Sequence, residues 1–434
     1  MTSARRAMAM AMAMLVLAGA AAAEQAPATA ASLVQASAPQ GRPASPVLRR
    51  MVRDTTYLCV TCHAENRDAF VQGVHAERGI RCHDCHGGNP RADTLPAAHA
   101  GRFVGKPTKV QTVTLCASCH ADPNRMRPFG LPSGEMAEFT TSRHGRLLLQ
   151  GRDNNAPSCI DCHDAHLIRR PDDARSDVYP TNIPATCGRC HSDAALMAPY
   201  NIPTDQVERF ERSAHGTALL EQKNFAAPAC IGCHGSHSAL PPSVTEVSTI
   251  CGRCHVSEAE AFDTGPHGLA AVSGRLEGCL GCHTNHDTEE VPANRIAATC
   301  TKCHAEGTSA HALGVEMQQF IVQAEEDLKR ADEVLDELTL VGRRTGDARF
   351  RYQTALTAFH QVGHVQHNLD IGQLEELSRR VRSISNDITA MMESHQERRW
   401  EHRLFLVVVW FLALSAVYLS WVALRRLGTS EPDA

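Results

Sequence analysis

The hydrophobic positions of this 434-residue chain follow three different patterns. Apolar runs stand near the two ends, at 7–20 and 404–424. Between 314 and 400, apolar residues recur every three or four positions, as they do on one face of a helix. Between 51 and 313 no such period is visible, and proline and glycine are frequent. These patterns predict a mainly α-helical protein with much irregular structure in its long middle segment.

The periodic segment predicts three long helices. The first has an apolar face made of Met317, Phe320, Ile321, Ala324, Leu328, Ala331 and Leu335. A second helix fits 348–367. The third carries a 3-4-3-4-3 seam made of Leu374, Leu377, Val381, Ile384, Ile388 and Met391. Such a seam packs either on another helix of the same chain or on a partner.

The apolar run at 404–424 contains no charged residue and is long enough to cross a bilayer as one helix. Trp400, Trp410 and Trp421 lie in or just before it, as aromatic residues often do at membrane edges. We expect a single transmembrane anchor followed by a short tail at 425–434. A buried core helix is the alternative.

The N-terminus has the layout of a secretory signal peptide at 1–23. Arg5 and Arg6 precede an apolar stretch, and three alanines before Glu24 offer a cleavage site. A short membrane anchor is the alternative reading. Residues 24–50 are rich in Ala, Pro, Gln and Ser, which is typical of a flexible leader.

Composition removes some possibilities. Aromatic residues make up only 5% of the chain, so the segment at 51–313 has little large apolar material for a core, and something other than side chains must fill it. The net charge of -5 gives no basic excess, so we expect no nucleic-acid partner.

The cysteines carry the clearest chemistry. All 18 fall into nine CxxCH motifs, at Cys59 and Cys62, Cys82 and Cys85, Cys116 and Cys119, Cys159 and Cys162, Cys187 and Cys190, Cys230 and Cys233, Cys251 and Cys254, Cys279 and Cys282, and Cys300 and Cys303. CxxCH attaches c-type haem: two thiols form thioethers with the haem vinyl groups, and the histidine becomes the proximal iron ligand. Zinc sites and local disulfides are the alternatives, but neither explains nine histidines in the same place.

The motifs therefore predict nine covalently attached haems. Their proximal ligands are His63, His86, His120, His163, His191, His234, His255, His283 and His304. Candidates for the second axial position are His75, His99, His144, His166, His215, His237, His267, His286 and His311, with His367 as a tenth. His83, His360, His364, His395 and His402 are not expected to be ligands.

The motifs also form repeats. Three stretches share an isolated histidine, a CxxCHxxH motif and a second CxxCH; they begin at His144, His215 and His267. A looser copy begins at His75, and the motif ending at His63 precedes it. About one haem per 27 residues implies that neighbouring porphyrins nearly touch, which suits electron transfer along a row.

These CxxCH and SxHG patterns resemble the multihaem c-type cytochromes of anaerobic and metal-respiring bacteria, and the helical segment is similar to that of octahaem and pentahaem nitrogen-cycle enzymes. The resemblance implies bis-histidine haems and periplasmic electron transfer. There are two departures: the anchor is C-terminal where quinol-oxidising relatives usually have it at the N-terminus, and no motif reads CxxCK.

Two functions remain open, with no catalytic residue assigned. The first is an electron carrier on the periplasmic side of the cytoplasmic membrane, which takes electrons from quinol or a quinol-oxidising complex and passes them to periplasmic acceptors. The second is a reductase or oxidase of nitrite, hydroxylamine or tetrathionate, which needs one open haem. The chain could also be a subunit of a larger complex.

Overall fold

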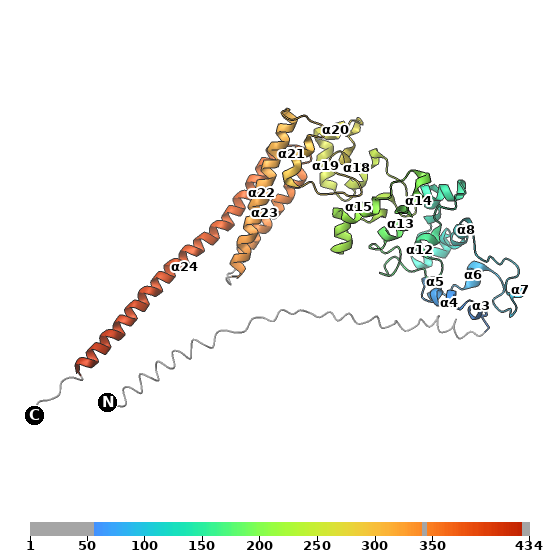
Figure 1. The fold of residues 1–434 in the computed structure, drawn as a ribbon, viewed down its shortest axis with the longest axis horizontal. Coiled ribbons are helices and arrows are strands. Elements are labelled where there is room, and N and C mark those ends of the chain that lie inside the picture. The colour runs from blue at the N-terminus through green and yellow to red at the C-terminus, as the bar shows by residue number, and fades with distance from the viewer. Residues whose placement is uncertain (1–55, 341–344, 428–434) are drawn as a thin grey trace, which may run out of the picture. The chain divides into compact units, whose positions relative to one another are not determined.

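The computed structural model describes residues 56–340 and 345–427 (Figure 1). Within these ranges the chain forms helices joined by irregular segments and has no strand, so the predicted fold class is confirmed. The predicted signal peptide at 1–23 and leader at 24–50 lie outside the described residues, as does most of the tail predicted at 425–434.

Short helices make up the motif segment, defined here as residues 56–308. Its first half contains α3 Cys59–Cys62, α4 Ala64–Phe70, α5 Val74–Glu77, α6 Cys82–His86, α7 Leu95–Ala98, α8 Lys109–His120, α9 Pro123–Met126, α10 Glu135–Thr141 and α11 Arg143–Gly145. Its second half contains α12 Cys159–His163, α13 Ile183–His191, α14 Ala194–Met197, α15 Gln206–Arg212, α16 Ala214–Gly216, α17 Cys230–His234, α18 Val244–Gly252, α19 Val256–Thr264, α20 Pro266–Val272 and α21 Ile296–Cys300. Single 3₁₀ or π turns are η1 Arg127–Phe129, η2 Arg146–Gln150, η3 Ala198–Tyr200, η4 Thr217–Glu221, η5 Gly278–Gly281 and η6 Ala293–Arg295.

Most CxxCH motifs form, begin or end a helical turn. In a helix, residues three apart lie on the same face, so the two thiols of such a motif point the same way. In CIDCH the motif also caps its own turn: the Asp161 carboxylate accepts from the Ser158 backbone N–H at 2.7 Å and from its hydroxyl at 2.8 Å. In CHDCH, Asp84 accepts from the Arg81 N–H at 2.7 Å. Short polar residues inside the motif therefore stabilise turns that are too short to be stable alone.

Three long helices follow the motif segment: α22 Ser309–Leu340, α23 Gly346–Val365 and α24 Ile371–Leu427. α22, α23 and the first third of α24 pack together, and we call this unit the bundle. Leu374, Val381 and Ile388 of the predicted seam are 0% exposed in it. Of the two alternatives for the seam, packing within the same chain is the one observed.

The bundle core is built from three clusters along α24. Met317, Ile321 and Val362 surround Leu374; Ala324, Leu328, Ala355 and Ala358 surround Val381; Ala331, Leu335, Leu338 and Ala348 surround Ile388. One carboxylate is buried among them: Asp327 is 3% exposed and is held by Arg330 at 3.2 Å and Arg382 at 3.0 Å. The two guanidiniums offset the cost of burying that charge.

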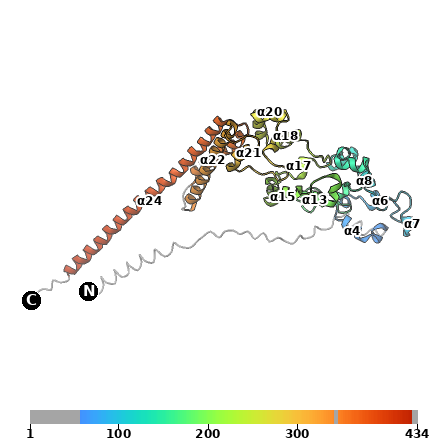
Figure 2. The same cartoon turned by 45° about the horizontal axis from the view of Figure 1, so that its top comes forward.

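Beyond the bundle, α24 continues alone, as Figures 1 and 2 show. Its segment Leu404–Arg425 is 22 residues long, has a mean hydropathy of 2.3 and is not buried by any other part of the described chain. Trp410 and Leu412 are 61% and 62% exposed. Its length and composition therefore allow it to cross a membrane, and a buried core helix is not what the described residues form.

Candidate haem-binding sites

Every proximal histidine faces one other histidine. The pairs are His63 with His99, His120 with His75, His86 with His166, His191 with His144, His163 with His237, His255 with His215, His234 with His286, His304 with His267, and His283 with His367. The ring centroids of these pairs lie 5.9–6.3 Å apart.

This separation fits an iron between the two rings. With metal–imidazole bonds of roughly 2.0 Å, one iron separates the ring centroids by about 6.2 Å. Ordinary aromatic pairs span about 4.5–7 Å, so the recurrence of this one distance at all nine CxxCH histidines is what points to a common cause. The nine pairs therefore have the spacing that a haem iron with two axial histidines requires.

Seven of the nine pairs fall into two classes. Histidines of the SxHG type face the second motif of their own repeat: His144 faces His191 and His215 faces His255, with ring planes inclined by 52° and 46°. Histidines of the CxxCHxxH type face the first motif of the preceding repeat. The ring planes of His234 and His286, for example, are inclined by only 11°. Each repeat thus completes a site in the repeat before it.

The last such site is completed from outside the repeats. His283 has no later CxxCHxxH histidine available, and His367, just after the end of α23, takes that place at 6.3 Å. His311 is not brought against a proximal histidine, because all nine already have partners. It lies in the first turn of α22, where its backbone N–H donates to the Thr308 hydroxyl at 3.3 Å. Of the two candidates for the ninth place, the structure brings His367 against a proximal histidine.

Two of the histidines not expected to be ligands, His83 and His364, have other neighbours, and His360 is exposed. His83 lies beside Tyr57, with 3.2 Å between its Nδ1 and the phenol oxygen. His364 pairs with Glu258 at 2.8 Å and so connects α23 to α19. The side chains of His395 and His402 lie outside the described residues.

Backbone carbonyls hold several of the paired imidazoles. The His367 Nδ1 lies 2.9 Å from the Gly363 carbonyl oxygen, and the His86 Nδ1 lies 2.9 Å from that of Val104. Because a carbonyl only accepts, Nδ1 carries the proton in each ring, which leaves the Nε2 lone pair free to bind a metal. The same contact holds His234 and His283, whose Nδ1 atoms lie 3.1 Å and 3.2 Å from carbonyl oxygens.

Close backbone contact explains the SxHG pattern. The Ser142 hydroxyl accepts from the Gly145 N–H at 2.9 Å and caps the turn that carries His144. A Cβ on Gly145 would overlap the Phe139 carbonyl oxygen, so glycine is required there. Ser213, Gly216 and Phe210 repeat the arrangement. The phenylalanine five residues before the histidine also recurs as Phe70 and Phe262. The CxxCH and SxHG patterns alone do not include this signal.

The comparisons with known proteins agree with this chemistry. Residues 250–326 match the family model described as cytochrome c554 and c-prime. They contain the last three CxxCH motifs and His267. The match supports a c-type cytochrome in this part of the chain. Such a domain implies covalently bound c-type haem and a role in electron transfer. Searches of curated proteins and of solved structures found no match.

Neighbouring repeats of the motif segment are also joined through their backbones. In each bond, the donor is the backbone N–H of the residue just before an SxHG-type histidine. The acceptor is a backbone carbonyl in the following repeat, two positions after its CxxCHxxH histidine. These bonds join Val74 to Ile168 at 2.9 Å, Arg143 to Ala239 at 3.1 Å, and Ala214 to Thr288 at 2.9 Å. In the last copy the donor position is Pro266, which has no N–H, and Gly265 packs directly on Asn368 instead. His367 therefore occupies the same place as the histidines of the earlier repeats.

Burial favours the neutral form of nine of the paired histidines by lowering the pKa of each. Burial and, secondarily, the neighbouring His191 lower the pKa of His144 to about 4. Burial is also the main cause that lowers the pKa of His75, His163, His166, His191, His215, His267, His286 and His367. A neutral imidazole is the form that binds a metal.

The thiols of consecutive motifs lie near one another. Three pairs lie close enough for each thiol to shift the pKa of the other: Cys116 and Cys159, Cys187 and Cys230, and Cys251 and Cys279. A neighbouring thiol also raises a cysteine pKa in five further pairs: Cys59 and Cys82, Cys85 and Cys119, Cys162 and Cys187, Cys233 and Cys254, and Cys282 and Cys300. Together these neighbouring thiols follow all nine motifs in chain order.

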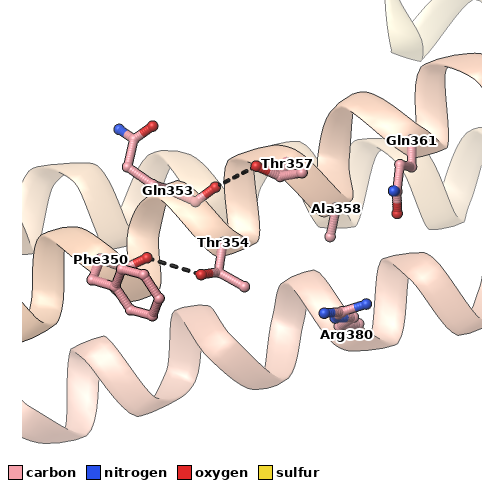
Figure 3. A pocket seen from close by; sticks show the side chains of 7 residues that line it. All are labelled: Phe350, Gln353, Thr354, Thr357, Ala358, Gln361 and Arg380. Carbon is pink, nitrogen blue, oxygen red and sulfur yellow. Dashed lines mark hydrogen bonds between the residues drawn. The ribbon is translucent and has the colours of Figure 1, made fainter.

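The alternatives to haem have no support here. All eighteen cysteines are free, so no motif forms a disulfide. Among the described residues, no three or more His, Cys, Asp or Glu side chains gather as a zinc site needs. A groove on the bundle, between α23 and α24, is lined by Phe350, Gln353, Thr354, Thr357, Ala358, Gln361 and Arg380 (Figure 3). It contains no histidine and lies apart from the nine pairs.

Proposed function

We propose that this chain binds nine c-type haems, each with two axial histidines, and transfers electrons among them. The single observation that supports this most is the set of nine histidine pairs with centroids 5.9–6.3 Å apart. The CxxCH cysteines would hold each haem covalently, and the CxxCH histidine would be the first axial ligand of its iron. The second histidine would occupy the remaining axial position. Two imidazoles give a low-spin centre suited to electron transfer.

The contacts between consecutive motifs support transfer in chain order. Thioether bonds form at one edge of each porphyrin. Thiols of neighbouring motifs that lie together, such as Cys116 and Cys159, therefore bring two haem edges together. On this proposal electrons pass from the motif at Cys300 to the motif at Cys59, or in the reverse direction, without leaving the protein.

We further propose that the cytochrome is anchored in the cytoplasmic membrane by Leu404–Arg425 and faces the periplasm. The apolar, exposed helix supports the anchor. The CxxCH motifs support the side, because c-type haem is attached after export. The proposed donor is quinol or a quinol-oxidising complex, and the acceptors are periplasmic redox proteins.

The reductase alternative requires an iron with an open axial position. The pairing assigns a second histidine to each of the nine motifs, including His367 to the motif at Cys279. This supports the carrier over the enzyme.

The test is a haem count combined with spectroscopy of the purified protein. We expect nine haems per chain, only low-spin signals in the electron paramagnetic resonance spectrum of the oxidised protein, and no carbon monoxide binding after reduction. A high-spin signal together with turnover of nitrite, hydroxylamine or tetrathionate would establish the enzyme instead.

A further inference from the structure

The last two haem motifs join the bundle at the end where α24 begins. His367, which faces His283, lies four residues before Ile371, the first residue of α24. The motif at Cys300 meets α22 at the same end, since a Cβ on Gly314 would lie 2.6 Å from the Cys300 Sγ. Ala293 and Ile296 pack there on Leu374 and its neighbours.

The apolar segment lies far from that end. α24 is one continuous helix, and 33 residues separate its first residue, Ile371, from Leu404, where the apolar segment begins. At 1.5 Å per residue this distance is about 50 Å along the helix axis. A tilt of about 20°, typical of transmembrane helices, would reduce the height of the start of α24 above the apolar segment by only a few ångström.

Packing keeps the first third of α24 straight. α22 and α23 lie along α24 from Leu374 to Ile388, and the three core clusters fall at successive levels of the bundle. The buried Asp327 adds a bond across the middle of the bundle to Arg382 of α24. The bundle therefore stiffens the part of this spacing that lies next to the two motifs, and the rest is the single helix α24.

This spacing bears on the electron donor, on the premise of the proposed function above. We infer that the donor to the motifs at Cys279 and Cys300 is a protein that itself reaches about 50 Å out of the membrane, and not quinol dissolved in the lipid. A lipid-dissolved quinol stays within the bilayer and its headgroup region, so it does not approach the motifs at Cys279 and Cys300.

The electrons balance through such a complex. One quinol is oxidised to quinone within the donor and loses two electrons and two protons. The electrons pass through the donor's own redox centres, and two ferric haems of this chain each accept one. The protons are released on the donor and do not pass through this chain.

The first experiment uses the full-length haem-loaded protein in phosphatidylcholine liposomes that contain a long-chain menaquinol. We expect the haems to stay oxidised there, although dithionite reduces them. In membranes from the producing organism, which contain the donor, we expect the same menaquinol to reduce them. Reduction in plain liposomes at the rate seen in native membranes would overturn the inference. Reduction in neither preparation would also overturn it, because no quinol-linked donor would then serve this chain.

The second experiment changes the length of α24 between the bundle and the apolar segment. Deletion of 392–398 brings the haem end about 10 Å closer to the membrane and turns the bundle by only about 20°. The matched control replaces the same seven residues with helix-forming ones. In native membranes we expect the deletion to lose menaquinol-driven reduction and the replacement to keep it.

A deletion variant that is reduced as fast as the control would contradict the inference. Haem content and low-spin spectra are measured on both variants. A loss of haem or of six-coordination would count against the proposed function, whereas intact haems with fast reduction by lipid quinol would count only against the protein donor.

Discussion

The His367→Ala substitution tests the least expected of the nine pairs. His367 is the one proposed axial ligand that lies beyond the motif segment, and its ring faces His283 at 6.3 Å. Removal of the imidazole leaves one iron of nine without a sixth ligand. We expect that iron to become high-spin and to bind one molecule of carbon monoxide per chain when it is reduced.

The structure also sets the size of the effects. One pair of nine is altered, so about one-ninth of the haem absorbance should respond to carbon monoxide. The variant should remain folded, because His367 contributes a single hydrogen bond, to Gly363, worth about 1 kcal/mol. Added imidazole should occupy the gap and restore the low-spin spectrum. Titration with carbon monoxide and electron paramagnetic resonance measure both quantities.

His311→Ala is the matched control. Its sequence context, SAHA, is closer to the SxHG pattern than that of His367, yet the structure places it against no proximal histidine. We expect no high-spin haem from this variant. If His311→Ala opened an iron and His367→Ala did not, the assignment of the ninth pair would be wrong.

Three further substitutions test the local structure. Gly145→Ala should displace His144 from its iron and give one high-spin haem, because the new methyl group overlaps a backbone carbonyl. Gly134→Ala is the control: there is open space around Gly134, so the haem spectra should stay unchanged. Ile388→Ala should cost the bundle about 2–5 kcal/mol in urea unfolding followed by circular dichroism, and Phe350→Ala, which is 72% exposed, should cost little. Asp327→Ala should cost about 1–3 kcal/mol in the same measurement, because the two arginines that lose their partner are half exposed and stay solvated.

The sequence was sufficient to predict the elements of the fold but not the sites they form. Helical spacing predicted the three long helices, and the 3-4-3-4-3 seam predicted the buried row of Leu374, Val381 and Ile388. Histidine contexts such as SxHG indicated which residues are candidates for the second axial position. These signals are local, so the residue pattern alone carries them.

The pairing of histidines was not predictable because it depends on contacts between distant segments. His86 and His166 are 80 residues apart, and only packing of one repeat on another brings them together. The choice of His367 over His311 has the same cause. The residues just after α23 pack on Gly265, where a Cβ would lie 3.0 Å from Asn368. The residue pattern around His367 gives no indication of that contact.

The arrangement resembles a repeat protein that needs a cap. Each repeat supplies a histidine to the one before it, so the final repeat would always lack one ligand if the series simply stopped. Here the bundle supplies it: His367 completes the site at His283, and the Glu258–His364 pair and the Gly265–Asn368 contact hold the end of α23 in place. The same helical unit therefore closes the haem series and, through α24, sets how far that end stands from the apolar segment. Loss of the bundle should cost one closed haem and leave the other eight pairs intact, since all of their histidines lie within residues 63–304.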